Sequence, residues 1–401
     1  MTINDFFISD NSYQIDWEFV WNLPHFCEMK NTQQSPRWHM EGTAFDHTIQ
    51  TVDNMTIFVI EESDCRTLHE CRLLMLSALF HDIGKPSTTF LGEKDNQWHS
   101  YGHDVVGSRI VREMLWDWDI YDREYIAHMV RYHMEPLFFL KSKDPVASVN
   151  KITQILPYRD IYLLKMADLE ASVQDPQYST KDADREIVAK FYEIGKELNN
   201  VSWLSCLKHF PERMNPEINN WVGCSGSLRA TNPYVNDDTL VDIHVMIGLP
   251  GSGKNTYIDY LKEKTPINKK GNLVELSRDD IRVELGYCSE GEKIVGTDKQ
   301  ERKVTEVFNK RLREAIANKC PIIINNINLS EKRRKQLKND AGNGNIRWNY
   351  WYIEAPTLED NLRRRKGQIS KKVFMDMISR FDFPQPHEYH NLTIVKQKKY
   401  E

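Results

Sequence analysis

The sequence predicts a multidomain protein in which an all-α bundle is followed by an α/β domain built on a parallel sheet. The chain has 401 residues with 40% hydrophobic content, more than a single hydrophobic core usually organises. Apolar residues recur at helical spacing through the first 200 residues, whereas short apolar runs alternate with charged helical stretches from residue 241 onward. Strands that alternate with helices are typical of a parallel sheet covered by helices.

The individual elements follow from these patterns. The clearest expected helices of the first half are Cys71–Leu79, Val105–Trp116, Ile126–Val130, Ile161–Ala167 and Ile187–Leu198. The expected strands of the second half are Ile243–Ile247, Leu273–Leu276, Pro321–Asn325 and Trp348–Glu354. Between the halves, Pro, Gly, Asn and Ser replace the apolar periodicity. We therefore expect a first domain at residues 1–200, a linker or docking segment at 201–240 and a second domain at 241–401.

Charge and composition limit the kinds of partner. The net charge of -5 divides into +9 from Val241 onward and -14 before it. A basic second half favours an anionic partner, although such a surplus is equally often only a solvated surface. No long uncharged apolar run and no signal peptide are visible, so we expect a cytoplasmic protein without a membrane partner. The seven cysteines are scattered and none forms a C-x-x-C pair, which favours ordinary reduced thiols.

The first half contains an adjacent histidine and aspartate at the end of an apolar helix. His81 and Asp82 are followed by Gly84 and Lys85. Imidazole and carboxylate ligands suit a borderline divalent metal, and the carboxylate can bridge to a second ion. Any one such histidine is more often an ordinary polar residue, but several together on different helices favour a metal site. The further candidate ligands are His47, His103, His133 and Asp168, with His128 as a substitute and His39 and His99 as surface or capping residues.

In the order H…HD…H…H…D these residues resemble the HD phosphohydrolase superfamily, and especially the HD region of bacterial tRNA nucleotidyltransferases. The resemblance covers roughly residues 37–172 and implies a helical bundle that holds two divalent transition-metal ions, such as Mn²⁺. It implies that the first ion is held by His47, His81, Asp82 and Asp168, and that Asp82 bridges to a second ion held by His103 and His133. Lys85 and Arg109 are candidate phosphate contacts.

The second half opens with a glycine-rich loop between an expected strand and an expected helix. The candidate nucleotide-binding residues are Gly248, Gly251, Ser252, Gly253, Lys254, Asn255 and Thr256. Glycines let consecutive backbone N–H groups surround a phosphate, and the lysine reaches the β and γ phosphates. The position after Lys254 normally carries a hydroxyl that ligates Mg²⁺, but Asn255 stands there. Either the amide oxygen of Asn255, a water molecule or Thr256 then holds Mg²⁺, or the site is impaired.

Acidic and basic residues follow at later strand ends. Asp279 and Asp280 come directly after an expected strand, where a carboxylate can take the proton of an acceptor hydroxyl. An isolated pair of this kind is otherwise read as the cap and first turn of a helix. The run Arg363–Lys366 suits a cationic lid or a solvated helix, and the run Lys332–Lys338 is expected to be a solvated helix face.

These motifs resemble the 5′-OH polynucleotide kinase family over roughly residues 242–388. The resemblance implies Asp279 as general base, Arg282 as binder of the acceptor-side phosphate, and a lid arginine within Arg363–Arg365, represented here by Arg364. In this family an acid stands where this chain has Asn326. In domain order the chain is similar to the bifunctional HD phosphohydrolase–polynucleotide kinases of RNA and DNA end repair.

That resemblance implies an enzyme that uses ATP, or another NTP, with Mg²⁺ to phosphorylate a 5′-OH end. It implies that the first domain removes a 2′,3′-cyclic phosphate or 3′-phosphate, so that a separate ligase can join the RNA or DNA ends. Two rivals remain at this point: a nucleotide or nucleoside kinase fused to a nucleotide phosphohydrolase, and an ATP-binding regulatory nucleic-acid-binding protein with a decayed kinase.

Overall fold

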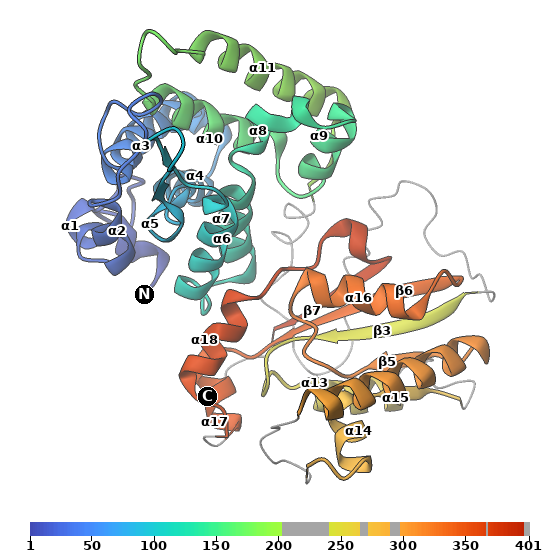
Figure 1. The fold of residues 1–401 in the computed structure, drawn as a ribbon. Coiled ribbons are helices and arrows are strands. Elements are labelled where there is room, and N and C mark those ends of the chain that lie inside the picture. Colours follow the sequence, from blue (N-terminus) through green and yellow to red (C-terminus); the bar gives the residue numbers. More distant parts are fainter. Residues whose placement is uncertain (203–239, 265–271, 289–296, 366–367, 397–401) are drawn as a thin grey trace. The chain divides into compact units, whose positions relative to one another are not determined.

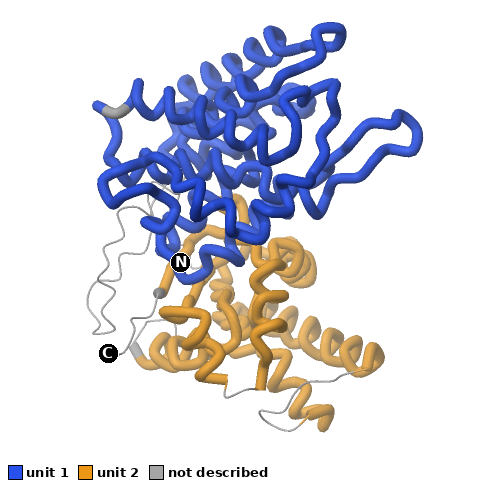
Figure 2. Tube along the Cα trace, turned by 90° about the vertical axis from the view of Figure 1, so that its left-hand side faces the viewer, with its two compact units in different colours: residues 1–209 blue, residues 210–401 orange. Residues whose placement is uncertain are grey.

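The chain forms two compact units. A computed structural model describes residues 1–202, 240–264, 272–288, 297–365 and 368–396. The chain divides between residues 209 and 210 (Figure 2). Most of the predicted linker, residues 203–239, lies outside the described residues, so the predicted boundaries at 200 and 241 stay predictions. None of the described helices has the length and apolar character needed to cross a membrane.

Unit 1 is helical, as the apolar spacing predicted (Figure 1). Its α-helices are α1 (Trp17–Trp21), α2 (Pro24–Met29), α3 (Ala44–Glu61), α4 (Leu68–Phe80), α5 (Lys85–Thr88), α6 (His103–Met114), α7 (Ile120–Tyr132), α8 (Glu135–Phe138), α9 (Pro145–Thr153), α10 (Tyr158–Ala171) and α11 (Lys181–Leu198). Short 3₁₀ turns lie at Ile3–Phe6, Ser63–Cys65 and Phe139–Lys141. One feature departs from an all-α bundle: an antiparallel hairpin of β1 (Phe90–Leu91) and β2 (Trp98–His99).

Helix α4 is the core of unit 1. Every residue from 71 to 80 is buried, which explains why the apolar residues surround this helix instead of forming a stripe. The helix begins with a capping box, in which Thr67 accepts a hydrogen bond from the Glu70 N–H and the Glu70 carboxylate accepts one from the Thr67 N–H. Helices α3, α7 and α10 pack against it. Because α4 ends at Phe80 and His81 is its C-cap, the core itself positions the His-Asp pair.

Unit 2 is built on a five-stranded parallel sheet, with strand order β4-β5-β3-β6-β7. Its strands are β3 (Val241–Ile247), β4 (Val274–Leu276), β5 (Ile322–Ile324), β6 (Ile346–Glu354) and β7 (Asn391–Lys396). Its helices are α13 (Lys254–Lys264), α14 (Arg278–Glu284), α15 (Asp298–Ala317), α16 (Glu331–Ala341), α17 (Leu358–Arg364) and α18 (Lys371–Ser379), with a 3₁₀ turn at Pro386–Glu388. All four predicted strands are confirmed, and β7 is an additional strand that the sequence reading missed.

Both faces of this sheet are buried. Met246, Ile323 and Ile353 pack with Ile258 and Leu261 of α13 in one hydrophobic cluster. The residues that alternate with these along the strands and face the other side of the sheet, such as Ile322 and Ile324, are also fully buried. This explains why the strands read as continuous apolar runs and not as alternating ones.

The run Lys332–Lys338 was predicted to be a solvated helix face, and this prediction is wrong for Arg334. Its side chain is fully buried. Its guanidinium donates two hydrogen bonds to the Glu388 carboxylate, at 2.7 and 2.9 Å, and two more to the backbone oxygens of Asn328 and Leu329. A bidentate pair of this kind satisfies the buried charge, which a charge count along the sequence does not reveal.

Candidate metal centre and phosphate-binding loop

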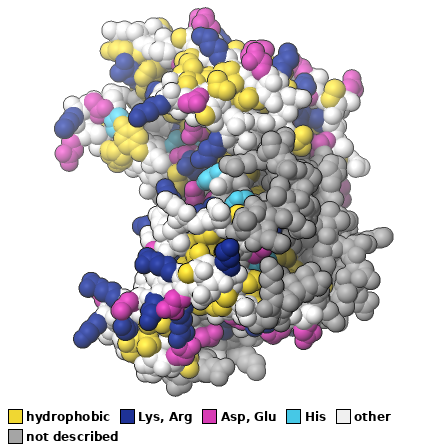
Figure 3. All heavy atoms as spheres, turned by 90° about the vertical axis from the view of Figure 1, so that its right-hand side faces the viewer, with side chains coloured by type: hydrophobic (Ala, Val, Ile, Leu, Met, Phe, Trp, Pro, Cys, Tyr) yellow, Lys and Arg dark blue, Asp and Glu magenta, His cyan; other side chains and the backbone are white. Residues whose placement is uncertain are grey.

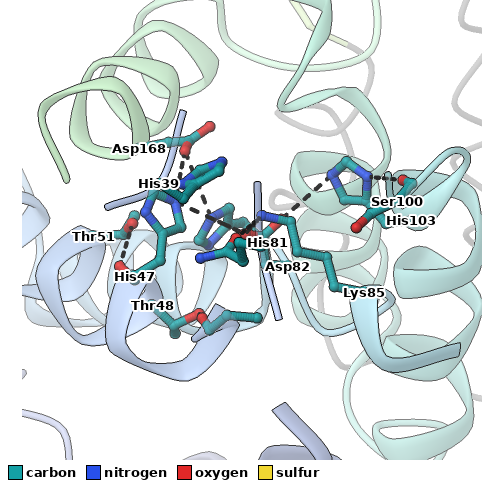
Figure 4. Close-up of polar contacts among 12 residues, drawn as sticks. His39, His47, Thr48, Thr51, His81, Asp82, Lys85, Ser100, His103 and Asp168 are labelled. Carbon is teal, nitrogen blue, oxygen red and sulfur yellow. Dashed lines mark hydrogen bonds and ion pairs between the residues drawn. The ribbon is translucent and has the colours of Figure 1, made fainter. Parts of the chain in front are cut away.

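The structure brings the six predicted metal ligands of unit 1 together from five helices, and Figure 4 labels His47, His81, Asp82, His103 and Asp168 among them. The ligands occupy helix ends or inner helix faces: His47 on α3, His81 at the end of α4 followed by Asp82, His103 at the start of α6, His133 at the end of α7 and Asp168 on α10. The side chains of His47, His81 and His133 are buried, whereas that of His103 is 12% exposed.

These residues form two groups that share Asp82. The ligand atoms of His47, His81 and Asp82 all lie within 4.8 Å of one another, and so do those of Asp82, His103 and His133. Asp82 Oδ2 lies 3.2 Å from His81 Nε2, whereas its Oδ1 lies 3.4 Å from His103 Nε2. Asp168 adds an oxygen 2.9 Å from His47 Nε2. One carboxylate therefore faces both groups with a different oxygen.

Three of the histidines have their ring orientation fixed by the backbone. The Nδ1–H groups of His81, His103 and His133 donate to carbonyl oxygens three residues earlier, at 2.8, 2.7 and 2.7 Å. In the neutral ring this leaves Nε2 with its lone pair, which is the form that binds a metal.

The resulting Nε2 positions fit bound cations. His103 Nε2 and His133 Nε2 lie 3.1 Å apart, so two neutral rings direct their lone pairs at one another. His81 Nε2 is buried and has no hydrogen-bond partner within the described part of the chain. A divalent ion would accept the facing lone pairs of His103 and His133 and the unpaired one of His81. The mixed imidazole and carboxylate donor set suits a transition metal.

Electrostatics favour the ligand forms of these groups. Burial lowers the pKa of His133 well below its ordinary value, and the neighbouring His103 and His81 add to the effect. Burial alone raises the pKa of the Asp82 carboxyl, but His81 and Lys85 outweigh it and hold that pKa well below the usual range. Lys85 Nζ lies 2.6 Å from Asp82 Oδ2. His133 is therefore held as a neutral imidazole and Asp82 as an ionised carboxylate, the forms that bind a metal.

Glu41 is a buried partner of the centre that the sequence reading missed. Its Oε1 accepts hydrogen bonds from His47 Nδ1 at 2.8 Å and His39 Nδ1 at 2.7 Å, and its Oε2 accepts one from the Val173 N–H. Burial alone lowers the pKa of His47, but hydrogen bonds with Asp168 and Glu41 raise it above its ordinary value. Glu41 thus orients His47 as backbone carbonyls orient the other rings. His39, expected at the surface or in a cap, belongs to this contact.

Gly84 explains the glycine in the His-Asp-x-Gly-Lys motif. A Cβ at this position would lie 2.1 Å from the His103 carbonyl oxygen and 2.6 Å from the Gly107 nitrogen. Only a residue without a side chain lets this turn approach the backbone of α6 so closely. The approach brings the segment of Asp82 and Lys85 against His103.

The remaining predicted residues of unit 1 lie outside the two ligand groups. His128 belongs to neither ligand group, and its Nδ1 donates to the Glu124 carbonyl oxygen at 2.6 Å. Arg109 Nε is buried, with no hydrogen-bond partner among the residues described, and its phosphate contact stays a prediction. Lys165, which the sequence reading did not single out, lies 2.7 Å from Asp168 Oδ2.

In unit 2 the glycine-rich loop follows β3, and α13 begins at Lys254. Gly251 has φ +76°, and a Cβ there would lie 2.8 Å from the Asn361 carbonyl oxygen. Lys254 Nζ donates to the carbonyl oxygens of Gly248 and Leu249, at 2.8 and 2.9 Å. Burial, together with the charge of Arg365, lowers the pKa of Lys254 to about 7. The lysine thus binds its own loop and lies where incoming phosphate oxygens can replace the carbonyl oxygens.

The loop also contains a buried hydroxyl, and Asn255, one of the predicted Mg²⁺ ligands, is linked to the sheet. Ser252 Oγ is buried and lacks a hydrogen-bond partner among the described residues, as expected of a group that awaits a phosphate oxygen. Asn255 and Thr256 are exposed. Asn325, after β5, donates its Nδ2 to Asn255 Oδ1 at 3.2 Å and to Glu275 Oε1 at 2.9 Å. The amide oxygen of Asn255 is therefore tied to the sheet but remains accessible.

The acidic pair lies at the start of α14. Ser277 is the N-cap and accepts from the Asp280 N–H, so neither acid serves as the cap itself. Asp279 has 73% of its side chain exposed, and its charge reaches Lys254. Arg282 donates to Asp279 Oδ1 at 2.5 Å and bidentately to Glu301 at 2.7 and 2.9 Å.

The three late arginines take different positions. Arg363 is 73% exposed and pairs with Asp360. Arg364 Nη1 donates to the Gly251 carbonyl oxygen at 3.1 Å. Arg365 is exposed, and its charge acts on Lys254. Arg364 is therefore hydrogen-bonded to the phosphate loop, whereas Arg365 acts on it only through its charge.

Comparisons with known proteins identify both domains. Residues 44–155 match the HD domain family, and residues 243–384 match the AAA domain family. The chain therefore carries an HD domain followed by a P-loop domain of kinase type. The order of these two matches agrees with the domain order that the motifs predicted.

Two curated proteins are similar to parts of the chain. An L-seryl-tRNA(Sec) kinase of Methanococcus maripaludis is 26% identical over 35% of this chain and 52% of its own length. A CC-adding tRNA nucleotidyltransferase of Thermus thermophilus is 27% identical over 44% of this chain and 37% of its own length. The chain thus spans about half of the first relative and just over a third of the second. Among solved structures, a Pnkp1/Rnl/Hen1 complex aligns over 42% of this chain and 49% of that one, with 18% identity and a TM-score of 0.29.

Proposed function

We propose that this protein prepares broken nucleic-acid ends for ligation, with an ATP-dependent 5′-OH polynucleotide kinase in unit 2 and a metal-dependent 2′,3′-cyclic phosphate or 3′-phosphate hydrolase in unit 1. The observation that carries the proposal is the presence, on one chain, of a phosphate-binding loop and a His/Asp cluster whose two ligand groups share Asp82. The first suits phosphoryl transfer and the second suits phosphate hydrolysis.

In the hydrolase site, His47, His81, Asp82 and Asp168 hold one ion, and Asp82, His103 and His133 hold the other. When bound, two divalent transition-metal ions such as Mn²⁺ neutralise phosphate charge and lower the pKa of a water. Glu41 keeps His47 oriented. Lys85, which lies beside Asp82, contacts the phosphate of the substrate.

In the kinase site, the loop from Gly248 to Gly253 surrounds the phosphates of ATP, and Lys254 exchanges its carbonyl partners for phosphate oxygens. Asp279 takes the proton of the 5′-OH as that oxygen bonds to the γ-phosphorus, and the bond to the bridging oxygen of ADP breaks. Arg282 aligns Asp279 and the acceptor. The Arg363–Arg365 run supplies positive charge to the transferring group, while Asn255 holds Mg²⁺ directly or through water.

The proposal that the substrate is a nucleic acid has separate support. Both curated relatives are named for reactions on tRNA, and the second half of this chain carries a net charge of +9. On the face drawn in Figure 3, basic side chains are interspersed with acidic ones.

The test uses radiolabelled γ-phosphate transfer to a 5′-OH oligonucleotide and, separately, phosphate release from a 3′-phosphate oligonucleotide. Lys254→Ala and Asp279→Ala are expected to reduce transfer by about 10²-fold or more and to leave phosphate release unchanged. Phosphorylation of nucleoside monomers without oligonucleotides would favour a small-molecule kinase instead. ATP binding without any transfer would favour a regulatory protein with a decayed kinase site.

A further inference from the structure

The short hairpin of unit 1 carries exposed aromatic side chains that core packing does not explain. Phe90 is 48% exposed and Tyr101, just after β2, is 72% exposed. Leu91 beside them is 46% exposed. Exposed apolar groups that cluster on one surface feature usually mark a binding site.

The rings of His99 and Tyr101 are stacked, and the Phe90 ring is tilted against both. The rings of His99 and Tyr101 are nearly parallel, at 15°, with centroids 5.1 Å apart. Phe90 lies 5.6 Å from the first ring and 5.8 Å from the second. His99 is in turn held by Asp95, whose Oδ2 lies 2.9 Å from its Nε2. Tyr101 therefore rests on a fixed support, with most of its ring open to solvent.

The hairpin is tied to the metal centre at both of its ends. Thr89 Oγ1 donates to the Lys85 carbonyl oxygen at 2.7 Å and shares a hydrogen bond with Ser100 Oγ at 2.7 Å. The Ser100 carbonyl oxygen accepts from Nδ1 of the candidate ligand His103 (Figure 4). Tyr101 stands two residues before His103, so their Cα atoms are at most about 7 Å apart. A base and the phosphate of the same nucleotide can therefore reach the two residues together.

We propose that Phe90, His99 and Tyr101 form a stacking platform for the nucleobase at the 3′ end of the substrate strand. The inference rests on the proposed hydrolase function and assigns it a substrate-binding element. Stacking accepts any base, because every base presents a π-face, so the platform favours a polynucleotide end without selecting its sequence. It also gives a role to His99, which the metal centre does not use.

The experiment measures phosphate release by the full-length, Mn²⁺-loaded protein from two oligonucleotides with a 3′-phosphate. One ends in an ordinary nucleotide, and the other ends in a tetrahydrofuran residue that lacks the base. For the wild type we expect KM to be about tenfold higher without the base. Tyr101→Ala should raise KM about tenfold for the ordinary end only, with kcat unchanged, while Tyr101→Phe should behave as the wild type.

Trp21→Ala is the matched control, since this aromatic residue on α1 is 51% exposed but lies outside the hairpin. It should leave both KM values unchanged. Equal KM values of the wild type for both oligonucleotides, or equal losses for both in Tyr101→Ala, would overturn the platform while the hydrolase function stands. If the wild type releases phosphate from neither, the hydrolase proposal falls. In that case the platform is tested by binding alone, with fluorescence anisotropy of a labelled oligonucleotide. An unchanged affinity in Tyr101→Ala would refute the platform.

Discussion

The two candidate sites differ in how they are held before any ligand arrives. In unit 1 the imidazoles are fixed by backbone carbonyls and by Glu41, and the ligand atoms already converge. In unit 2 Lys254 binds the carbonyls of its own loop, while Asp279 is exposed. The first site is organised for ions that stay bound. Under the proposed function, the second exchanges these internal contacts for contacts with ATP, and the arginines that follow add positive charge near the transferred phosphate.

The largest expected effect is that of Asp82→Ala, because Asp82 is the residue that both ligand groups share. We expect the loss of both ions and of phosphate release, with 5′ phosphorylation retained. The fall in metal affinity should exceed about 100-fold, since residues that merely orient a ligand already contribute about 10- to 100-fold. Elemental analysis of the purified variant measures this directly. Undiminished metal content would refute the bridging role.

Lys254→Ala should reduce kcat of the kinase by about 10²- to 10³-fold, the usual cost of removing one charge-stabilising group from a transition state. Phosphate release in unit 1 is the internal control and should be unchanged. If both activities fall together in a folded protein, the two sites are not independent.

Glu41→Gln sharpens the contrast between the sites, because it keeps the shape of the side chain but removes the charge that orients His47. We expect Mn²⁺ affinity to fall by about 10- to 100-fold in calorimetry. Glu170→Gln serves as the control, since Glu170 is a carboxylate that pairs with Arg185 and belongs to neither ligand group. An unchanged affinity in Glu41→Gln would show that His47 needs no orienting partner.

The lowered pKa of Lys254 predicts how stability depends on pH and how many protons are taken up when ATP binds. Burial shifts this pKa from 10.5 to about 7, so between these values the folded protein holds fewer protons at this site than the unfolded chain does. Its contribution to stability therefore rises with pH across that window and is lost as pH falls toward 7. The phosphates of ATP favour the charged amine, so ATP binding at pH about 8 should take up a proton. Calorimetry in buffers of different ionisation heat measures this uptake, and its persistence in Lys254→Met would contradict the assignment.

The smallest effect is expected for Asn255→Ser. A hydroxyl restores the commoner Mg²⁺ ligand at the same position, so the rate of phosphoryl transfer should change only a few-fold. The variant loses the hydrogen bond from Asn325, and a modest loss of stability should follow. Strong activation of an otherwise inactive wild type would show instead that the kinase had decayed.

The features that could be predicted from the sequence are those that depend on residues close together in the chain. The apolar run of α4, the four strands and the glycine loop depend on local patterns, and they were predicted correctly. The contacts of Glu41 with His47 and of Arg334 with Glu388 arise only from tertiary packing. The hairpin at residues 90–99 was missed because its strands have two residues each, too few to show a periodicity.

The most direct test of the central claim uses one oligoribonucleotide that carries a 5′-OH and a 2′,3′-cyclic phosphate. With ATP, Mg²⁺ and Mn²⁺, mass spectrometry should show a product with a 5′-phosphate and a 3′-OH. Without ATP only the 3′ end should change, and Asp82→Ala should change only the 5′ end. A wild-type protein that binds ATP and metal but alters neither end would contradict the account.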